Sequence, residues 1–270
     1  MLRSFVVGAI AATGAVVLTP ACADNNSSLF ITAVLYRKAP TCTIIADPTS
    51  ETLGGGILDF AFTKSYDAAL LVGNQLTSRG SKETLRTETS RVTLRGAEIK
   101  VTTADGTTLN DFSVNGTGFV DVSRGEDSGF GIFDTELIPS SVGTQLLKRL
   151  NDLKIRTKST SLQTSDQVVA HVKVFGNTLG GQDITSSELS FPITYCEGCL
   201  IDFPLSAIDV LGNGNATCTK DTTDIPIPGC RVGQDDLIDC RACASTNPLC
   251  HDVDSTSAGL SPSGGADAGP

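Results

Sequence analysis

Apolar and polar positions alternate along most of the chain between Leu29 and Tyr195. The alternation is clearest in LFITAVLYR, GIFDTELI, QVVAHVKVFG, SELSFPITY and GGGILDFAFT, and in the last of these it puts Leu58, Phe60 and Phe62 on one face. A period of two is typical of a β-strand with one buried face. Turn residues separate these stretches at intervals of about 8–12 residues, a spacing typical of sandwiches. We therefore predict an all-β domain over residues 29–195, an immunoglobulin/fibronectin-like β-sandwich.

Three local patterns refine this prediction. The more continuous apolar run YDAALLVGNQL suits a central strand that is covered on both faces. In VTLRGAEIKVTT the alternation slips at Arg95-Gly96, which indicates a β-bulge. Asp105-Gly106 in TTADGTTL is a strong hairpin signal. Two small sandwiches divided near residues 105–130 are the alternative to one elaborated sandwich.

One short helix is expected within the β domain. The segment PSSVGTQLLKRL offers Ser140 or Ser141 as an N-cap, and its apolar residues at helical spacing are Val142, Leu146, Leu147 and Leu150. We expect this helix to connect the sheets. The following LKIRTKS alternates again and is expected to form a strand.

The composition changes at Cys196. Asp, Asn, Gly, Pro and Thr fill the spaces between seven cysteines in residues 196–250. A segment with so few apolar residues depends on crosslinks for its stability, so we predict a disulfide-rich, loop-rich unit. Residues 251–270 have almost no apolar content, and we predict a disordered tail.

The amino terminus has the layout of an export signal. Arg3 precedes an uncharged apolar run that ends at Leu18, and we assign residues 1–21 to a signal peptide. Small residues precede Cys22 and a polar stretch follows it, so we predict lipidation of Cys22 and a tether over residues 22–28. Ordinary cleavage after Ala23 is the alternative.

Eight cysteines remain once Cys22 is set aside, and an even number in an exported chain favours disulfides. The predicted disulfide cysteines are Cys42, Cys196, Cys199, Cys218, Cys230, Cys240, Cys243 and Cys250. Cys42 is alone in the sandwich and should join the C-terminal segment to it. The two C-x-x-C pairs should bond mostly outside their own motifs, because a bond within C-x-x-C closes a tiny ring. Zinc binding and a redox centre are the alternatives for these pairs.

Charge and histidine content exclude several kinds of chemistry. From Cys22 onward the chain carries 19 Lys and Arg against 30 Asp and Glu, a net charge of −11, without a basic run. Nucleic acid is therefore an unlikely partner. His171 shares a strand face with Lys173, and His251 lies in the predicted tail. We predict no catalytic, cofactor-binding or metal-binding residue, and no cofactor.

Several segments carry a resemblance to a family of proteins. The combination of YDAALLVGNQL, ETSRVTLRGAEIKV, VKVFGNTLGG, FPITYCEGCL and GQDDLIDCRAC with NPLC resembles a family of uncharacterised secreted lipoproteins from myxobacteria. The resemblance covers most of the chain after the signal peptide. It implies export, a lipid anchor and a Gram-negative envelope, and it implies no site residues. Ala23 after the cysteine favours the outer membrane.

These observations predict a non-enzymatic envelope lipoprotein with a structural or binding role. Its expected partners are the membrane, through the lipid, and an envelope protein. A thiol–disulfide redox protein that uses the C-x-x-C pairs is one alternative. A hydrolase with a site assembled from loops, around His171, is the other.

Overall fold

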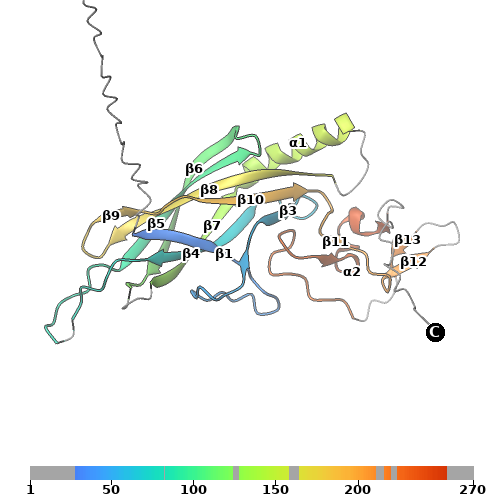
Figure 1. The fold of residues 1–270 in the computed structure, drawn as a ribbon. Coiled ribbons are helices and arrows are strands. Elements are labelled where there is room, and N and C mark those ends of the chain that lie inside the picture. Colours follow the sequence, from blue (N-terminus) through green and yellow to red (C-terminus); the bar gives the residue numbers. More distant parts are fainter. Residues whose placement is uncertain are drawn as a thin grey trace, which may run out of the picture.

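The computed structural model describes residues 28–81, 83–123, 128–157, 164–210, 216–219 and 224–253. The predicted signal peptide, Cys22 and all of the predicted tether except Ser28 lie outside these residues. The regular structure of the described chain is mainly β-strands (Figure 1). The first sheet has the order β2 (Thr52–Leu53), β1 (Leu29–Leu35), β4 (Tyr66–Asn74) and β7 (Gly129–Ile138). The second has the order β3 (Gly56–Asp59), β10 (Leu189–Cys196), β8 (Ser165–Thr178), β5 (Val92–Thr103) and β6 (Thr108–Val120), and β9 (Asp183–Thr185) pairs with β8.

The two sheets share one hydrophobic core. Leu70 of β4, Ile99 of β5 and Val172 of β8 are fully buried in the same cluster. Strands from before and after residues 105–130 thus contribute to one core. The neighbouring strands of both sheets are antiparallel, except that β3 runs parallel to β10.

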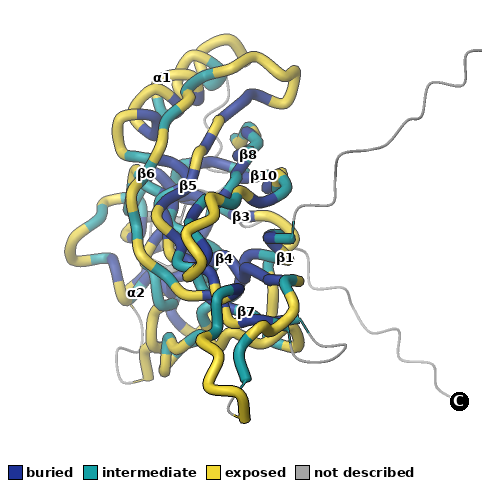
Figure 2. Tube along the Cα trace, turned by 90° about the vertical axis from the view of Figure 1, so that its left-hand side faces the viewer, coloured by how far each residue is buried: buried dark blue, intermediate teal, exposed yellow. Residues whose placement is uncertain are grey.

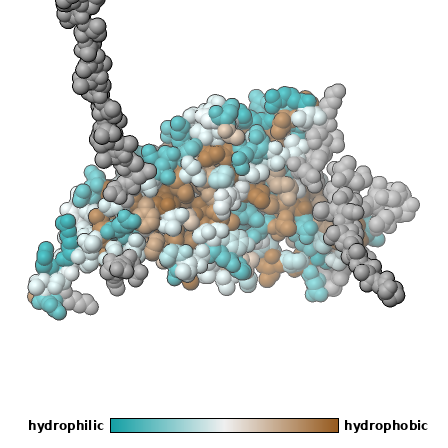
Figure 3. Space-filling model, viewed as in Figure 1, coloured by the Kyte–Doolittle hydropathy of each residue, from teal (hydrophilic) through white to brown (hydrophobic). Residues whose placement is uncertain are grey.

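Strand β4 is covered on both faces, as its apolar run predicts. Leu70 faces the shared core, whereas Leu71 belongs to a separate cluster with Leu35 and the partly buried Ile44 and Ile132. Figure 2 shows buried residues along the middle strands and exposed residues on α1 and in the loops. In the view of Figure 3, apolar residues gather over the middle of the molecule, and the projecting loop between β4 and β5 is more hydrophilic.

The predicted bulge and hairpin are both present. The register of β5 shifts between Leu94 and Gly96 against both of its neighbours, β6 and β8. The hairpin between β5 and β6 turns at Gly106, which has a φ of +86° and donates its N–H to the Thr103 carbonyl at 2.9 Å. A positive φ costs glycine little, which explains the Asp-Gly pair at this turn.

The helix is longer than predicted. It is α1 (Ser140–Thr157), and its last turns include most of LKIRTKS, so the strand predicted there is wrong. Leu146 and Leu150 are fully buried one turn apart, and Lys154 forms an ion pair with Glu197 at 2.8 Å. Ile155 is 74% exposed. The alternation in LKIRTK therefore arises on a solvated helix end. None of the helices in the described residues is long and apolar enough to cross a membrane.

Strand β3 is shorter than predicted. It ends at Asp59, and residues 60–63 turn away from the sheet. The Asp59 carboxylate accepts the N–H of Ala61 at 2.9 Å, a local bond that competes with continued strand pairing. Phe60 still enters the shared core, whereas Phe62 packs against the C-terminal segment.

The C-terminal segment lies at one end of the two sheets (Figure 1). It contains β11 (Ile201–Asp202), β12 (Ile208–Val210), β13 (Ala216–Cys218), β14 (Ile238–Asp239), α2 (Cys240–Cys243), the 3-10 helix η1 (Pro248–Cys250) and β15 (Asp252–Val253). Ile201, Ala207 and Ile238 form a small core with the cysteines. Strand β15 pairs with β13, so the predicted tail is wrong for residues 251–253. Residues 254–270 lie outside the described chain.

Candidate functional site

The eight cysteines named from the sequence lie in four pairs at disulfide distance. The pairs are Cys42–Cys230, Cys196–Cys199, Cys218–Cys240 and Cys243–Cys250, with Cα–Cα distances of 5.5, 5.9, 6.0 and 5.7 Å. These distances are typical of disulfides. The Cys42 pair joins the loop after β1 to the C-terminal segment, which is the arrangement expected for this residue.

The two C-x-x-C motifs pair differently. Cys240 and Cys243 bond outside their motif, as expected. Cys196 and Cys199 bond to each other, and the expectation of outside partners is wrong for this motif. Gly198 has a φ of +86°, which lets the chain turn tightly enough to bring the two cysteines together.

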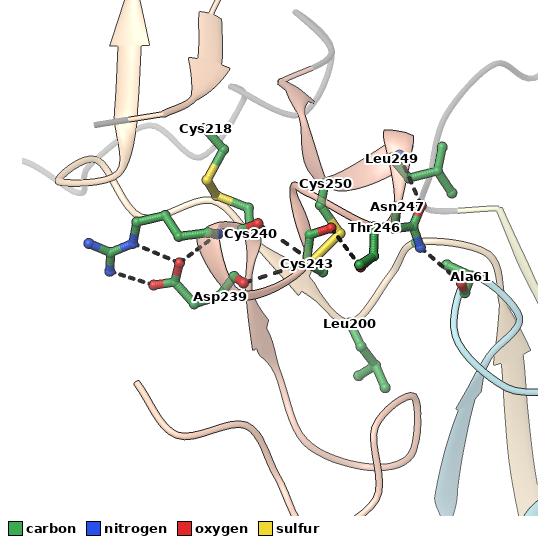
Figure 4. The surroundings of a disulfide bond; sticks show 12 residues. Ala61, Leu200, Cys218, Asp239, Cys240, Cys243, Thr246, Asn247, Leu249 and Cys250 are labelled. Carbon is green, nitrogen blue, oxygen red and sulfur yellow. Dashed lines mark hydrogen bonds and ion pairs between the residues drawn. A yellow bond between two sulfur atoms is a disulfide. The ribbon is translucent and has the colours of Figure 1, made fainter. Parts of the chain in front are cut away.

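A buried ion pair orders the surroundings of α2 (Figure 4). Asp239 caps the helix by accepting the Arg241 N–H at 2.9 Å, and the Arg241 guanidinium contacts both oxygens of the same carboxylate at 2.8 and 2.6 Å. These bonds hold the pKa of Asp239 below its usual value. The Asn247 amide donates to the Ala61 carbonyl at 2.9 Å, which ties the segment to the turn after β3.

A second aspartate was missed by the sequence analysis. Asp59 is fully buried, and its carboxylate accepts N–H groups from Gly198 at 2.6 Å, Leu200 at 2.8 Å and Ala61 at 2.9 Å. Burial raises the pKa of Asp59, and the three N–H groups oppose this rise. Its bonding partners Gly198 and Leu200 belong to the Cys196–Cys199 loop.

Both aspartates lie beside cysteine sulfurs. The ligand atoms of Asp59, Cys196 and Cys199 are all within 4.8 Å of one another, and those of Cys218, Asp239 and Cys240 form an equivalent group. Cysteine binds zinc as a thiolate. The sulfurs in each group are joined to each other, so neither group offers a thiolate in this state.

A polar cluster joins the first sheet to the C-terminal segment. The Tyr66 hydroxyl donates to Asp235 at 2.9 Å, and the Ile57 N–H donates to the same carboxylate at 2.9 Å. Tyr36 donates to Asp236, and Arg231 pairs with Asp67. The cavity among these residues is about 20 Å³, enough for about one water molecule. The cluster therefore holds the C-terminal segment on the first sheet and leaves no space for a substrate.

His171 lies on the outer face of the second sheet, as the strand pattern predicts. Its Nε2 is 3.1 Å from the Thr102 hydroxyl oxygen, and its Nδ1 is 3.1 Å from a Glu188 oxygen and 3.0 Å from the Ser190 hydroxyl oxygen. The side chain is 25% exposed. His171 therefore lies in a hydrogen-bonded group on a sheet face, and it does not line the groove described next.

A groove of about 1080 Å³ runs over the outer face of β5, β6, β8 and β9. Its lining is mainly uncharged. It includes the polar side chains of Thr93, Ser113, Asn115, Thr117, Asn177, Thr178 and Thr185, the Phe175 ring, and three charged residues, Arg95, Glu98 and Asp183. Gly116 and Gly176 contribute backbone to the lining, since a Cβ at Gly116 would meet Phe133 of the core and one at Gly176 would meet the Thr93 carbonyl of the next strand. Arg95 donates to the Asn177 side chain at 3.0 Å, which fixes one end of the lining. The groove could not be found from the sequence pattern, since it forms from outward positions of strands far apart in the chain.

Comparison with models of known protein families finds no match, and comparison with curated proteins finds no relative.

Proposed function

We propose that the protein is a non-enzymatic binding module of the cell envelope, anchored to the outer membrane through a lipid on Cys22. The groove on the second sheet carries this proposal. We interpret the two-sheet framework as an immunoglobulin/fibronectin-like β-sandwich, a scaffold that hosts many binding functions. The resemblance to secreted lipoproteins of myxobacteria supports export and anchoring.

The chemistry of the groove suits a neutral polar partner, because most of its lining is uncharged and two of its three charged residues, Arg95 and Asp183, are bound to the Asn177 side chain. Its hydroxyl and amide side chains offer both donors and acceptors, and Phe175 offers one apolar surface. The lining residues extend from hydrogen-bonded strands, so binding does not require the backbone to become ordered. An exposed polar loop of an envelope protein has the matching chemistry, and we propose it as the ligand.

The carboxylates whose pKa values burial raises, Asp59, Glu136 and Asp235, favour binding over catalysis at the groove, because none of them lines it. Asp59 is bound to the Cys196–Cys199 loop, and Asp235 to Tyr66 and Ile57. General acid–base catalysis usually needs such a group within hydrogen-bond reach of the substrate. The groove offers a surface for recognition instead.

Site-specific photocrosslinking in intact envelopes tests the groove. A crosslinker at Asn115, exposed in the groove, should yield a discrete adduct with an envelope protein, whereas one at Asp152, exposed on α1, should not. Ser113→Trp, which fills the groove, should reduce the Asn115 adduct at least tenfold without changing the melting temperature. Equal adducts from both positions, or a Ser113→Trp variant that crosslinks normally, would contradict the proposal.

Detergent partitioning tests the anchor independently. The wild-type protein should enter the detergent phase, and Cys22→Ser should move it to the aqueous phase, because the acyl chains on the cysteine supply the affinity for the membrane. A water-soluble wild-type protein that begins at Asp24 would show ordinary cleavage after Ala23.

A further inference from the structure

The loop between β10 and β11 combines a disulfide with a buried acid. Cys196 is fully buried at the end of β10, and Cys199 is partly exposed. The carboxylate of Asp59 lies within 4.8 Å of both sulfurs. Thiol–disulfide exchange requires a disulfide with one sulfur that a donor thiolate can reach, and it is helped by a nearby group that can give a proton to the leaving sulfur. This loop contains both.

The Cys196–Cys199 bond is the least useful of the four as a structural crosslink. It joins residues three apart, whereas the other bonds join residues 188, 22 and 7 apart. A crosslink restricts the unfolded chain more as the loop it closes becomes longer. The loop is also held by other means, since Asp59 binds Gly198 and Leu200, and the Phe60 N–H donates to the Cys196 carbonyl at 2.8 Å. Reduction of this bond should therefore leave the fold intact.

The Cys218–Cys240 bond provides an internal contrast, because it also lies beside an aspartate. Asp239 is bound on both oxygens by Arg241, which stabilises its anionic form. The partners of Asp59 are backbone N–H groups, and burial raises its pKa. The charge of Glu197 also raises the pKa of Asp59, and Lys154 forms an ion pair with Glu197 at 2.8 Å. Asp59 can therefore exchange a proton in a pH range where Asp239 cannot.

We propose that Cys196–Cys199 is a redox-active disulfide that exchanges with dithiol proteins of the envelope. This exchange is a second activity of the protein, added to the non-catalytic binding proposed for the groove, and it does not depend on that binding.

The exchange proceeds in two balanced steps. A thiolate of the donor attacks the sulfur of Cys199, the Cys196–Cys199 bond breaks, and its electron pair goes to Cys196. Cys196 takes a proton from Asp59, which regains one from water. The second donor thiol, as a thiolate, then attacks the donor sulfur of the mixed disulfide, and Cys199 leaves and is protonated. The donor dithiol becomes a disulfide, and two electrons and two protons reach the cysteine pair.

The order of reduction tests the proposal on the full-length mature protein. Folded protein is treated with limiting dithiothreitol, quenched by alkylation, and mapped by peptide mass. Cys196 and Cys199 should be labelled at least tenfold faster than Cys218 and Cys240, with unchanged circular dichroism. Equal rates for these pairs, or loss of structure when only Cys196 and Cys199 are labelled, would overturn the proposal.

A matched pair of variants tests the role of Asp59. Asp59→Asn should slow the reduction of Cys196–Cys199 at least fivefold. Between about pH 5 and 8, the reduction rate of the variant should then depend on pH only through ionisation of the donor thiol. Asp239→Asn should leave both properties unchanged. A wild-type pH profile in Asp59→Asn would remove the proton-transfer role. If either variant fails to fold, the wild-type order of reduction still decides whether the disulfide is redox-active.

Discussion

At the scale of single residues, carboxylates with little or no exposure to solvent hold the C-terminal segment on the sheets. Asp235 has a raised pKa because of its burial, and bonds from the Ile57 N–H and the Tyr66 hydroxyl oppose the rise. A group whose pKa is raised on folding destabilises the fold as pH rises through the interval between its ordinary and its raised value. The hydroxyl of Tyr66 limits this loss, because it stabilises the charged form.

Tyr66→Phe should lower the free energy of unfolding by about 1–3 kcal/mol at neutral pH, since it removes a hydrogen bond to a partly buried carboxylate. The loss should be smaller at about pH 3, where Asp235 is protonated in both states. Urea unfolding at the two pH values measures this. Tyr195→Phe is the control and should cost less, because Tyr195 donates at 2.7 Å to Asp166, which lines an open surface pocket beside α1. An equal loss at both pH values would refute the charge argument.

At the scale of elements, α1 is attached to the sheets by one half of its length. Val142, Leu146 and Leu150 are fully buried, and beyond them the helix continues into solvent with Ile155 exposed. The burial repeats every four residues, which keeps these side chains on one face. The C-terminal turns are held by the ion pair between Lys154 and Glu197.

Leu150→Ala should reduce the free energy of unfolding by about 2–5 kcal/mol, because it leaves a cavity between the helix and the sheets. Ile155→Ala should change it by less than about 0.5 kcal/mol, because that side chain is already in water. Chemical denaturation of the two variants under identical conditions gives the comparison. Similar losses from both would mean that the end of the helix is packed.

At the scale of the whole molecule, the Cys42–Cys230 bond connects the loop after β1 to a segment 188 residues away. The adjacent Arg231 and Asp236 contact Asp67 and Tyr36, so the bond and the polar cluster act at the same junction. Together they make the sheets and the C-terminal segment one connected unit.

Replacing Cys42 and Cys230 by alanine should cost about 3–5 kcal/mol of stability, whereas replacing Cys196 and Cys199 should cost about 2 kcal/mol or less. The difference follows from the lengths of the two closed loops. Thermal unfolding of both double variants measures this difference. In the wild type, where all eight cysteines are paired, intact-mass analysis after alkylation without reductant should show no added label. A larger loss of stability in the variant without Cys196 and Cys199 would show that this bond has a structural role.

The features that could be predicted from the sequence depend on neighbours along the chain. The slip at Gly96, the turn at Gly106 and the buried run of β4 follow from local sterics and periodicity. The end of α1 could not be predicted, because Lys154 finds its partner 43 residues away. The burial of Asp59 was missed for the same reason, since the N–H groups that it accepts at Gly198 and Leu200 come from about 140 residues further along.

The position of β1 has a mechanical consequence for a tethered protein. The chain enters β1 at the end of the molecule away from the C-terminal segment (Figure 1), and β1 is paired along its length with β4. Its hydrogen bonds to β4 lie across the strand axis. Tension between a membrane anchor and the C-terminal segment would therefore load these bonds in shear, all at once rather than one by one. The pairing of β1 with β4 should therefore resist a force that pulls β1 along its own axis.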